Sequence, residues 1–238
     1  MTVSQLLDYP IWAALTTRQS ALAEVNGPAR RYPPAIAPFA AVADETPASW
    51  AALHALMGPD QPAVMFTPDP FVPPAALFDI VMAATGEQMI GTPAEFSTPT
   101  PPHITLGADD VPAMMDLVEL TKPGPFGLRT HELGHFLGIR IDGRLVAMTG
   151  ERMAPANYTE MTAVCVHPDF RGRGYAQALL AAVARNIVAR GEIPFLHVFS
   201  ENASAIALYR RQGMTVRRRL HVTVLGRAGD NLREKMPH

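Results

Sequence analysis

The chain has 238 residues, which is enough for one large domain or two small ones. Hydrophobic residues make up 48% of it and charged residues 18%, so we expect a packed core rather than disorder. The formal net charge of -2 gives no basic field for holding nucleic acid. No stretch approaches the ~20 apolar residues that a membrane span needs. From the charge we therefore expect no nucleic-acid partner, and from the apolar stretches no membrane partner.

The chain has a single cysteine, Cys165, so a disulfide framework and a cysteine-rich zinc site are both excluded. One unpaired cysteine fits a reducing compartment. Residues 1–19 also lack the basic start and apolar run of a signal peptide. We therefore expect a cytoplasmic protein.

Proline divides the chain into two unequal parts. Sixteen of the 23 prolines precede His103 and seven follow it. Residues 91–102, GTPAEFSTPTPP, read as a linker, because proline has no backbone N–H to give to a helix or a strand ladder. We therefore predict two domains, residues 1–100 and 101–238.

The N-terminal half has the pattern of a folded region but no chemical motif. Apolar spacing predicts a helix over residues 11–23, ended by the Asn26-Gly27-Pro28 run. A second helix should start with Thr46 as its N-cap and Pro47 in its first turn, and bury Trp50 and Leu53. Short strands are expected at residues 38–42 and 63–67. We predict a structural or dimerisation role for this half.

The C-terminal half alternates between helices and strands, which is typical of an α/β sheet with helices on its faces. A hairpin is expected across Asp142-Gly143, because this pair tolerates positive φ. The remaining elements are a strand at 104–106, a helix from Asp109 or Asp110 to residue 121, strands at 159–166 and 194–200, helices at 174–190 and 202–211 that end at Gly191 and Gly213, and one or two strands at 215–225.

The sharpest chemical feature is the segment VCVHPDFRGRGYAQALL, in which a buried strand turns directly into a helix. Gly172 and Gly174 lack a Cβ, so their amides can approach a ligand closely. The first N–H groups of the following helix have no partner inside it, and Arg171 and Arg173 add positive charge. This pattern favours a phosphate or pyrophosphate ligand. The segment is neither a Walker loop nor a GxGxxG fingerprint.

The segment RGRGYA resembles the acetyl-CoA pyrophosphate loop of the GNAT superfamily of N-acetyltransferases, with Arg171, Gly174 and Ala176 on the loop pattern. Three other segments resemble the same family in the same order. FLGIRIDGRLVAMTGERM is similar to its second and third strands, TEMTAVCVHPDF to its fourth, and FLHVFSENASAIALYRRQGM to its fifth strand and following helix. The resemblance covers roughly residues 103–226. The whole sequence resembles a branch with a degenerate, GNAT-like N-terminal half.

This resemblance implies an α/β fold with a mixed, mainly antiparallel sheet, flanking helices and splayed central strands, preceded by a smaller α/β half. It implies transfer of an acetyl group from acetyl-CoA, as cosubstrate, to a primary amine of a small molecule, peptide or protein. The amine would attack the thioester directly, without a metal. A homodimer is compatible with the sequence, although no residue indicates one.

The resemblance also assigns residues to the cosubstrate. The backbone of Val164, Cys165 and Val166 would bind the pantetheine arm, and the alternative for Cys165 is a buried thiol that acts as a small hydrophobic side chain. Asn202 would lie near the pantetheine, a role compatible with that of a helix N-cap. The pyrophosphate would be held mainly by backbone N–H groups of Arg171, Gly172, Arg173, Gly174, Tyr175 and Ala176.

Two catalytic residues follow from the same resemblance. Tyr209 matches the tyrosine that protonates the leaving thiolate, and its alternative is a core tyrosine. Glu160 matches a glutamate that acts as general base, directly or through water, and its alternative is a solvated carboxylate at a strand end. Glu151 and His197 are further candidates for the base.

The segment His131-Glu132-Leu133-Gly134-His135 matches the HExxH motif of zinc peptidases, in which both histidines share a helix face. Gly134 weakens a helix there, and a strand is expected from Phe136. The resemblance to the GNAT family implies that this stretch is a loop or short helix before the second strand. Two alternatives to acetyl transfer stay open, a non-catalytic CoA-binding sensor or scaffold and, more remotely, a zinc hydrolase.

Overall fold

The computed structural model describes residues 3–91, 96 and 101–232. Contacts divide the chain into two compact units, each described here by itself. Unit 1 comprises residues 1–86, 154–156 and 219–238, and unit 2 comprises residues 87–153 and 157–218. Most of the expected linker lies outside the described residues. The division into domains 1–100 and 101–238 stays a prediction.

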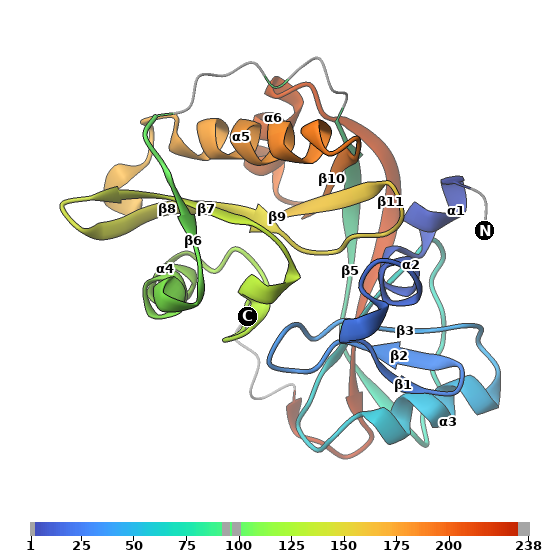
Figure 1. Cartoon of the computed structure of the whole chain (residues 1–238). Helices are drawn as coiled ribbons and strands as arrows, with labels where there is room; N and C mark the ends of the chain where they lie inside the picture. Colours follow the sequence, from blue (N-terminus) through green and yellow to red (C-terminus); the bar gives the residue numbers. More distant parts are fainter. Residues whose placement is uncertain (1–2, 92–95, 97–100, 233–238) are drawn as a thin grey trace. The chain divides into compact units, whose positions relative to one another are not determined.

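Unit 2 is built on a mainly antiparallel sheet with the strand order β10-β9-β8-β7-β6. The pairs β6–β7, β7–β8 and β8–β9 are antiparallel, and β9–β10 is parallel. Helices α4 and α5 cover opposite faces of this sheet (Figure 1). The bounds are β6 Ile104–Leu106, α4 Val111–Thr121, β7 Phe136–Ile141, β8 Arg144–Glu151, β9 Tyr158–Val166, α5 Tyr175–Ala189, β10 Ile193–Phe199 and α6 Ala203–Arg211.

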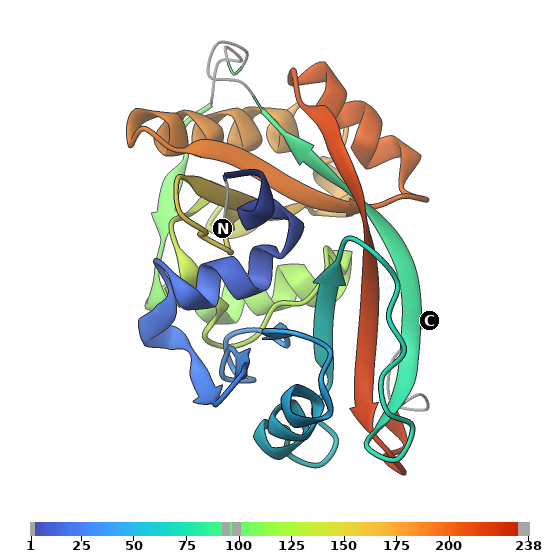
Figure 2. The ribbon, with the colours of Figure 1, turned by 90° about the vertical axis from the view of Figure 1, so that its right-hand side faces the viewer.

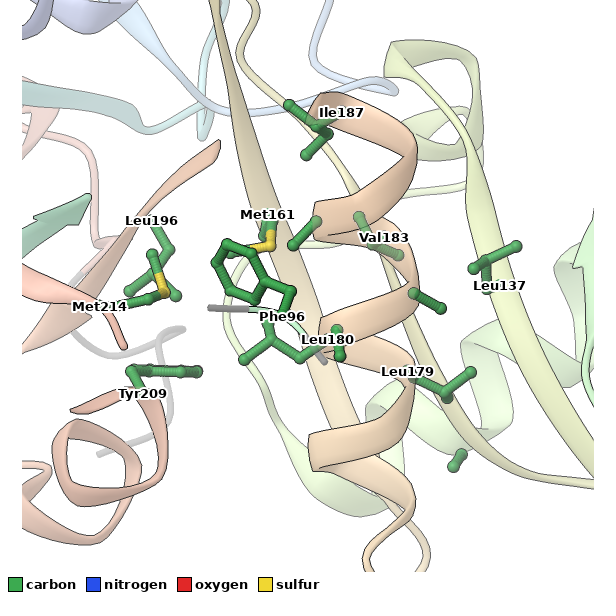
Figure 3. Packing of buried hydrophobic residues seen from close by; sticks show 14 of the residues in the cluster. Phe96, Leu137, Met161, Leu179, Leu180, Val183, Ile187, Leu196, Tyr209 and Met214 are labelled. Carbon is green, nitrogen blue, oxygen red and sulfur yellow. The ribbon is translucent and has the colours of Figure 1, made fainter. Parts of the chain in front are cut away.

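The two faces of this sheet bury two separate apolar clusters, as the period of two along a strand requires. The larger cluster packs α5 against Leu137, Ile139 and Val146. Figure 3 shows Phe96 between the side chains of α5 and those of Leu196 and Met214. The smaller cluster packs α4 against the other face and includes Phe136, Leu145, Met148 and Cys165.

The predicted elements of unit 2 are confirmed at their turns. Asp142 and Gly143 have φ values of 49° and 79°, which a two-residue hairpin turn requires. Gly174 precedes α5, and Gly191 follows it with φ 77°. The amide of Gly191 donates to Val188 O and that of Glu192 to Ile187 O, which closes the helix.

Strands β9 and β10 are paired at only three positions, Tyr158–Ile193, Thr159–Pro194 and Glu160–Phe195. Both strands continue beyond this point without further pairing to each other, so the sheet opens between them. On its other edge, β9 pairs with β8 through an irregular register, and Ala163 there has φ 51°. A bulge of this kind turns backbone groups away from the regular ladder.

Unit 1 contains a three-stranded antiparallel sheet, β1-β2-β3, and a second group of strands in which β4 pairs antiparallel with β11. Figure 2 shows β4 beside the long β11. Strands β5 and β11 contribute residues to both units. The bounds are α1 Val3–Asp8, α2 Pro10–Thr16, β1 Glu24–Asn26, β2 Ala29–Arg31, β3 Ala40–Val42, α3 Pro47–Leu56, β4 Ala63–Thr67, β5 Phe78–Ile90 and β11 Thr215–Arg227; short 3₁₀ turns are Ser20–Leu22, Ala108–Asp110, Thr130–Leu133 and Pro168–Phe170.

The predicted start of α3 is confirmed, because Thr46 Oγ1 accepts the Ser49 N–H at 3.3 Å. Trp50 and Leu53 are buried as expected, and the Trp50 ring stacks on Phe71 at a centroid distance of 5.3 Å. The helix expected over residues 11–23 is shorter. It ends at Thr16, and the hydroxyls of Thr16 and Thr17 both bond to carbonyls of the last turn.

Among the described residues, no helix has both the length and the apolar character needed to cross a membrane.

Candidate active site

A buried group of polar side chains lies where β9 and β10 part. The Glu160 carboxylate is 0% exposed and accepts two hydrogen bonds from Arg152, from Nε at 2.8 Å and from Nη2 at 2.7 Å. His197 Nδ1 lies 2.7 Å from Glu160 Oε1. Burial alone would raise the pKa of Glu160, but the charge and hydrogen bonds of Arg152, aided by His197, lower it from 4.5 to about 2. Glu160 is therefore ionised at neutral pH.

The same group continues beyond His197. Its Nε2 lies 3.0 Å from Gln88 Nε2, and Gln88 Oε1 accepts from Arg217 Nη1 at 2.9 Å. Since the Gln88 amide nitrogen can only donate, Nε2 of His197 accepts, and the His197 proton sits on Nδ1, where it donates to Glu160. Every contact in this series then joins one donor to one acceptor.

Tyr209 lies on α6 with 8% of its surface exposed, in the apolar cluster that also contains Leu180, Leu196 and Met214. Figure 3 shows its ring pointing from α6 toward α5. Burial raises the pKa of Tyr209 from 10.0 to about 12. The hydroxyl therefore keeps its proton at neutral pH and can donate a hydrogen bond.

The glycine-rich turn leads into α5 as the sequence predicts. Gly172 and Gly174 have φ values of 76° and 77°, and a Cβ placed on either one meets no atom within 4 Å. Both sit in the left-handed region that glycine adopts without strain. The Ala178 amide donates to Gly174 O at the start of α5, and the amides of Tyr175 and Ala176 lie ahead of this bond, at the end of a helix where amides are open to a ligand. The side chains of Arg171 and Arg173 are exposed beside this start, and the Arg173 guanidinium lies over the Phe170 ring.

Strand β9 divides the three predicted pantetheine residues between the two faces of the sheet. Val164 and Val166 pack against the α5 cluster, whereas Cys165 belongs to the α4 cluster. Burial raises the pKa of the Cys165 thiol from 9.0 to about 11, so this thiol stays protonated. The alternative of a buried thiol is confirmed for the side chain. Its backbone role stays a prediction.

Asn202 is the N-cap of α6, since its Oδ1 accepts the Ala205 N–H at 3.1 Å. The compatible capping role is thus confirmed. Glu151, a further candidate base, is 4% exposed and accepts from Arg190 Nη2 at 2.9 Å. Its carboxylate is engaged by a cation as that of Glu160 is.

The HELGH segment is not an α-helix. Thr130–Leu133 forms a 3₁₀ turn, Gly134 follows in an extended conformation, and β7 begins at Phe136. His131 and His135 therefore do not share the helix face on which the zinc motif depends. Glu132 instead pairs with Arg129 at 2.6 Å. Within the described ranges, no three His, Cys, Asp or Glu side chains are grouped to hold a metal ion.

Sequence reasoning missed Arg152 and Gln88, which complete the polar group around Glu160. Arg152 directly follows the end of β8 and reaches Glu160 on the neighbouring strand. Predicting this contact required the register of β8 and β9, which the irregularity near Ala163 changes. The available signal was an arginine at the end of a predicted hairpin, opposite a glutamate at the start of the next strand.

Comparisons with known proteins agree with this geometry. The family model described as FR47-like protein matches residues 136–222. The chain is similar to the solved structure of an acetyltransferase from the GNAT family of Novosphingobium aromaticivorans DSM 12444, with 42% identity, a TM-score of 0.86, and coverage of 93% of this chain and 98% of the other. A GCN5-related N-acetyltransferase from Kribbella flavida shares the fold over 98% of both chains, with 17% identity and a TM-score of 0.60.

Two curated relatives match shorter parts. Mycothiol acetyltransferase of Saccharomonospora viridis is 37% identical over 89 residues, and N-alpha-acetyltransferase RimI of Mycobacterium tuberculosis is 36% identical over 83 residues. These matches cover 34% and 33% of this chain, and only 29% and 51% of the relatives. The similarity to the Novosphingobium protein, in contrast, extends over 93% of this chain and 98% of that protein. Together with the parted strands and the turn before α5, this similarity shows that the chain belongs to the GNAT family of acetyltransferases.

Proposed function

We propose that the protein transfers the acetyl group of acetyl-CoA to a primary amine of a small molecule, peptide or protein, by direct attack of the amine on the thioester. The observation that carries this proposal is the parting of β9 and β10 beyond the Glu160–Phe195 pair. The parting leaves backbone groups of β9 without a β10 partner, and these can bind an extended, amide-containing arm. The start of α5 supplies amides for the pyrophosphate.

In this proposal the backbone of Val164, Cys165 and Val166 binds the pantetheine, and Asn202 lies close to it. A backbone N–H of β9, such as that of Val164, stabilises the oxyanion of the tetrahedral intermediate. The pyrophosphate is held by Arg171, Gly172, Arg173, Gly174, Tyr175 and Ala176. The acceptor, the homodimer and the degenerate GNAT-like character of the N-terminal half stay predictions.

Proton removal from the amine falls to the Glu160–His197 pair. The low pKa of Glu160 supports a carboxylate that stays ionised rather than one that takes up a proton at neutral pH. Glu160 then orients His197, and His197 accepts the proton through Nε2 once the amine takes the place of Gln88 there.

A titration of two glycine variants with acetyl-CoA tests the binding site. Gly174→Leu should weaken acetyl-CoA binding at least tenfold, because the new side chain fills the space in which the phosphates approach the backbone. Gly191→Leu is the matched control, since both glycines have φ 77° and open space around a Cβ, but Gly191 lies at the far end of α5. Both variants carry a similar backbone strain of roughly 1–2 kcal/mol.

Calorimetry with acetyl-CoA and with CoA distinguishes the outcomes. Native protein that binds neither ligand would refute the proposal, and equal affinity losses in both variants would refute the assignment of the loop. Tight binding with no acetyl transfer to any amine tried would favour a CoA-binding sensor or scaffold.

A further inference from the structure

Unit 1 contains a cavity of about 470 Å³ that the acetyl-transfer proposal does not use. Its volume falls within the range of about 300–1,000 Å³ typical of small-molecule sites. Aromatic side chains form much of its lining, namely Tyr9, Trp12, Trp50, Phe66 and Phe71. Tyr9 directly precedes α2, Trp12 lies on α2 and Trp50 on α3, while Phe66 lies on β4 and Phe71 in the loop after β4.

Two carboxylates join this aromatic lining, Asp44 and Glu45, both in the loop between β3 and α3. The pocket lining includes no lysine or arginine. The Arg30 guanidinium lies 4.6 Å from the centroid of the Trp12 ring, although Arg30 is not among the lining residues. Trp12 thus already accepts one cation on a ring face.

Asp44 is held in place through one oxygen only. Its Oδ1 accepts from Thr46 N at 3.1 Å, from Thr46 Oγ1 at 2.7 Å and from Ser49 Oγ at 2.5 Å. These bonds lower the pKa of Asp44 and keep it ionised. None of them uses Oδ2, and no hydrogen bond or ion pair to the Glu45 carboxylate is found among the described residues. Asp44 therefore places a negative charge beside the aromatic cavity, and its Oδ2 and the Glu45 carboxylate can accept hydrogen bonds from a ligand.

We propose that this cavity binds an organic ammonium ion with an apolar body. The ammonium group lies against Asp44 Oδ2 and the Glu45 carboxylate, and the body packs among the rings of Trp12, Trp50 and Phe71. Negative charge combined with aromatic faces selects a cation over a neutral molecule of the same shape. None of the lining residues is among those proposed for acetyl transfer, so the test of this proposal does not depend on that activity.

The chain has two tryptophans, and both Trp12 and Trp50 line the cavity, so intrinsic fluorescence reports on it directly. We expect 2-phenylethylammonium to change this fluorescence saturably and 2-phenylethanol to bind at least tenfold more weakly. The alcohol has the same ring and chain length but no charge. Absence of a saturable change with the ammonium ion in the millimolar range would overturn the proposal, as would equal binding of the alcohol.

Charge-neutralising variants locate the site. Glu45→Gln and Asp44→Asn should each weaken the ammonium ion severalfold, and about tenfold together, while leaving the alcohol unaffected. Asp69→Asn is the control, because Asp69 is an exposed carboxylate of the loop after β4 that does not line the cavity. Equal weakening by Asp69→Asn would mean a diffuse electrostatic effect and overturn the site. Asp44→Asn also changes the bonds that Asp44 makes to the first turn of α3, so its effect includes any change in the stability of that helix. Glu45→Gln removes no such bond and therefore tests ammonium binding by itself.

Discussion

Replacing Tyr209 with phenylalanine is expected to lower kcat for acetyl transfer about 100-fold. With a pKa of about 12, the hydroxyl stays protonated, but it is a weaker acid than a thiol. We therefore propose that it donates a hydrogen bond to the sulfur as negative charge develops there, and losing one such donor costs about 10²–10³-fold in rate. The measurement is kcat with the amine that the native protein acetylates fastest.

The matched control for this prediction is Tyr158→Phe. Tyr158 is also buried, with 6% of its surface exposed against 8% for Tyr209, but it lies on β9 and has no proposed role in catalysis. Its kcat should stay within a few-fold of native. Acetyl-CoA affinity should be retained in Tyr209→Phe, and the two pH profiles should run parallel up to about pH 10, because the hydroxyl ionises only near 12. A native kcat in Tyr209→Phe would leave Tyr209 as a core residue.

Removing the cation beside Glu160 should destabilise unit 2 strongly. Arg152→Met leaves a carboxylate that is 0% exposed without its bidentate partner, and breaking a buried pair in this way costs about 3–5 kcal/mol of unfolding free energy. The double variant Arg152→Met/Glu160→Gln removes the charge as well, so most of the loss should be recovered. Urea denaturation followed by far-UV circular dichroism measures both. A double variant no more stable than Arg152→Met would contradict the role of the pair.

The same pair predicts how stability depends on pH. The folded pKa of Glu160, about 2, lies below its ordinary value of 4.5, so the stabilisation is fully present above pH 4.5. It is lost as the pH falls toward 2, because protonation then favours the unfolded chain. A shift of this size corresponds to about 3 kcal/mol. In Glu160→Gln, the free energy of unfolding should depend less on pH between about 4.5 and 2 than in the native protein. An equally steep loss of stability in the variant over this range would contradict the prediction.

The sequence predicts the elements whose signals are local. The Asp142-Gly143 turn, the Thr46 cap and the glycines that flank α5 each depend on a few neighbouring residues, and all are confirmed. The candidate site is different, because its geometry depends on strand register. Glu160 matches a family position, but its pairing with Arg152 and His197 brings together residues from β9, from the end of β8 and from β10.

Strand β5 is an element of the fold that local sequence signals do not predict. Its 13 residues, FDIVMAATGEQMI, lack a regular alternation of buried and exposed positions. They also include Ala, Gly and Glu, which are depleted in strands. Tertiary pairing rather than local preference therefore produces this strand. The sequence does not predict the positive φ of Ala163 either, because nothing in an alanine side chain favours a positive φ.

The pairing of β4 with β11 has a consequence for synthesis on the ribosome. Residues 63–67 pair with residues 221–225, and Arg227 Nη1 donates to the carbonyls of His54 and Met57 near the end of α3. Unit 1 therefore combines strand β4 with a part of β11 that is translated only after all of unit 2, whose last residue is 218. Until residue 227 emerges, β4 presents an unpaired edge, so the N-terminal half should complete its folding after unit 2, against the usual order of translation.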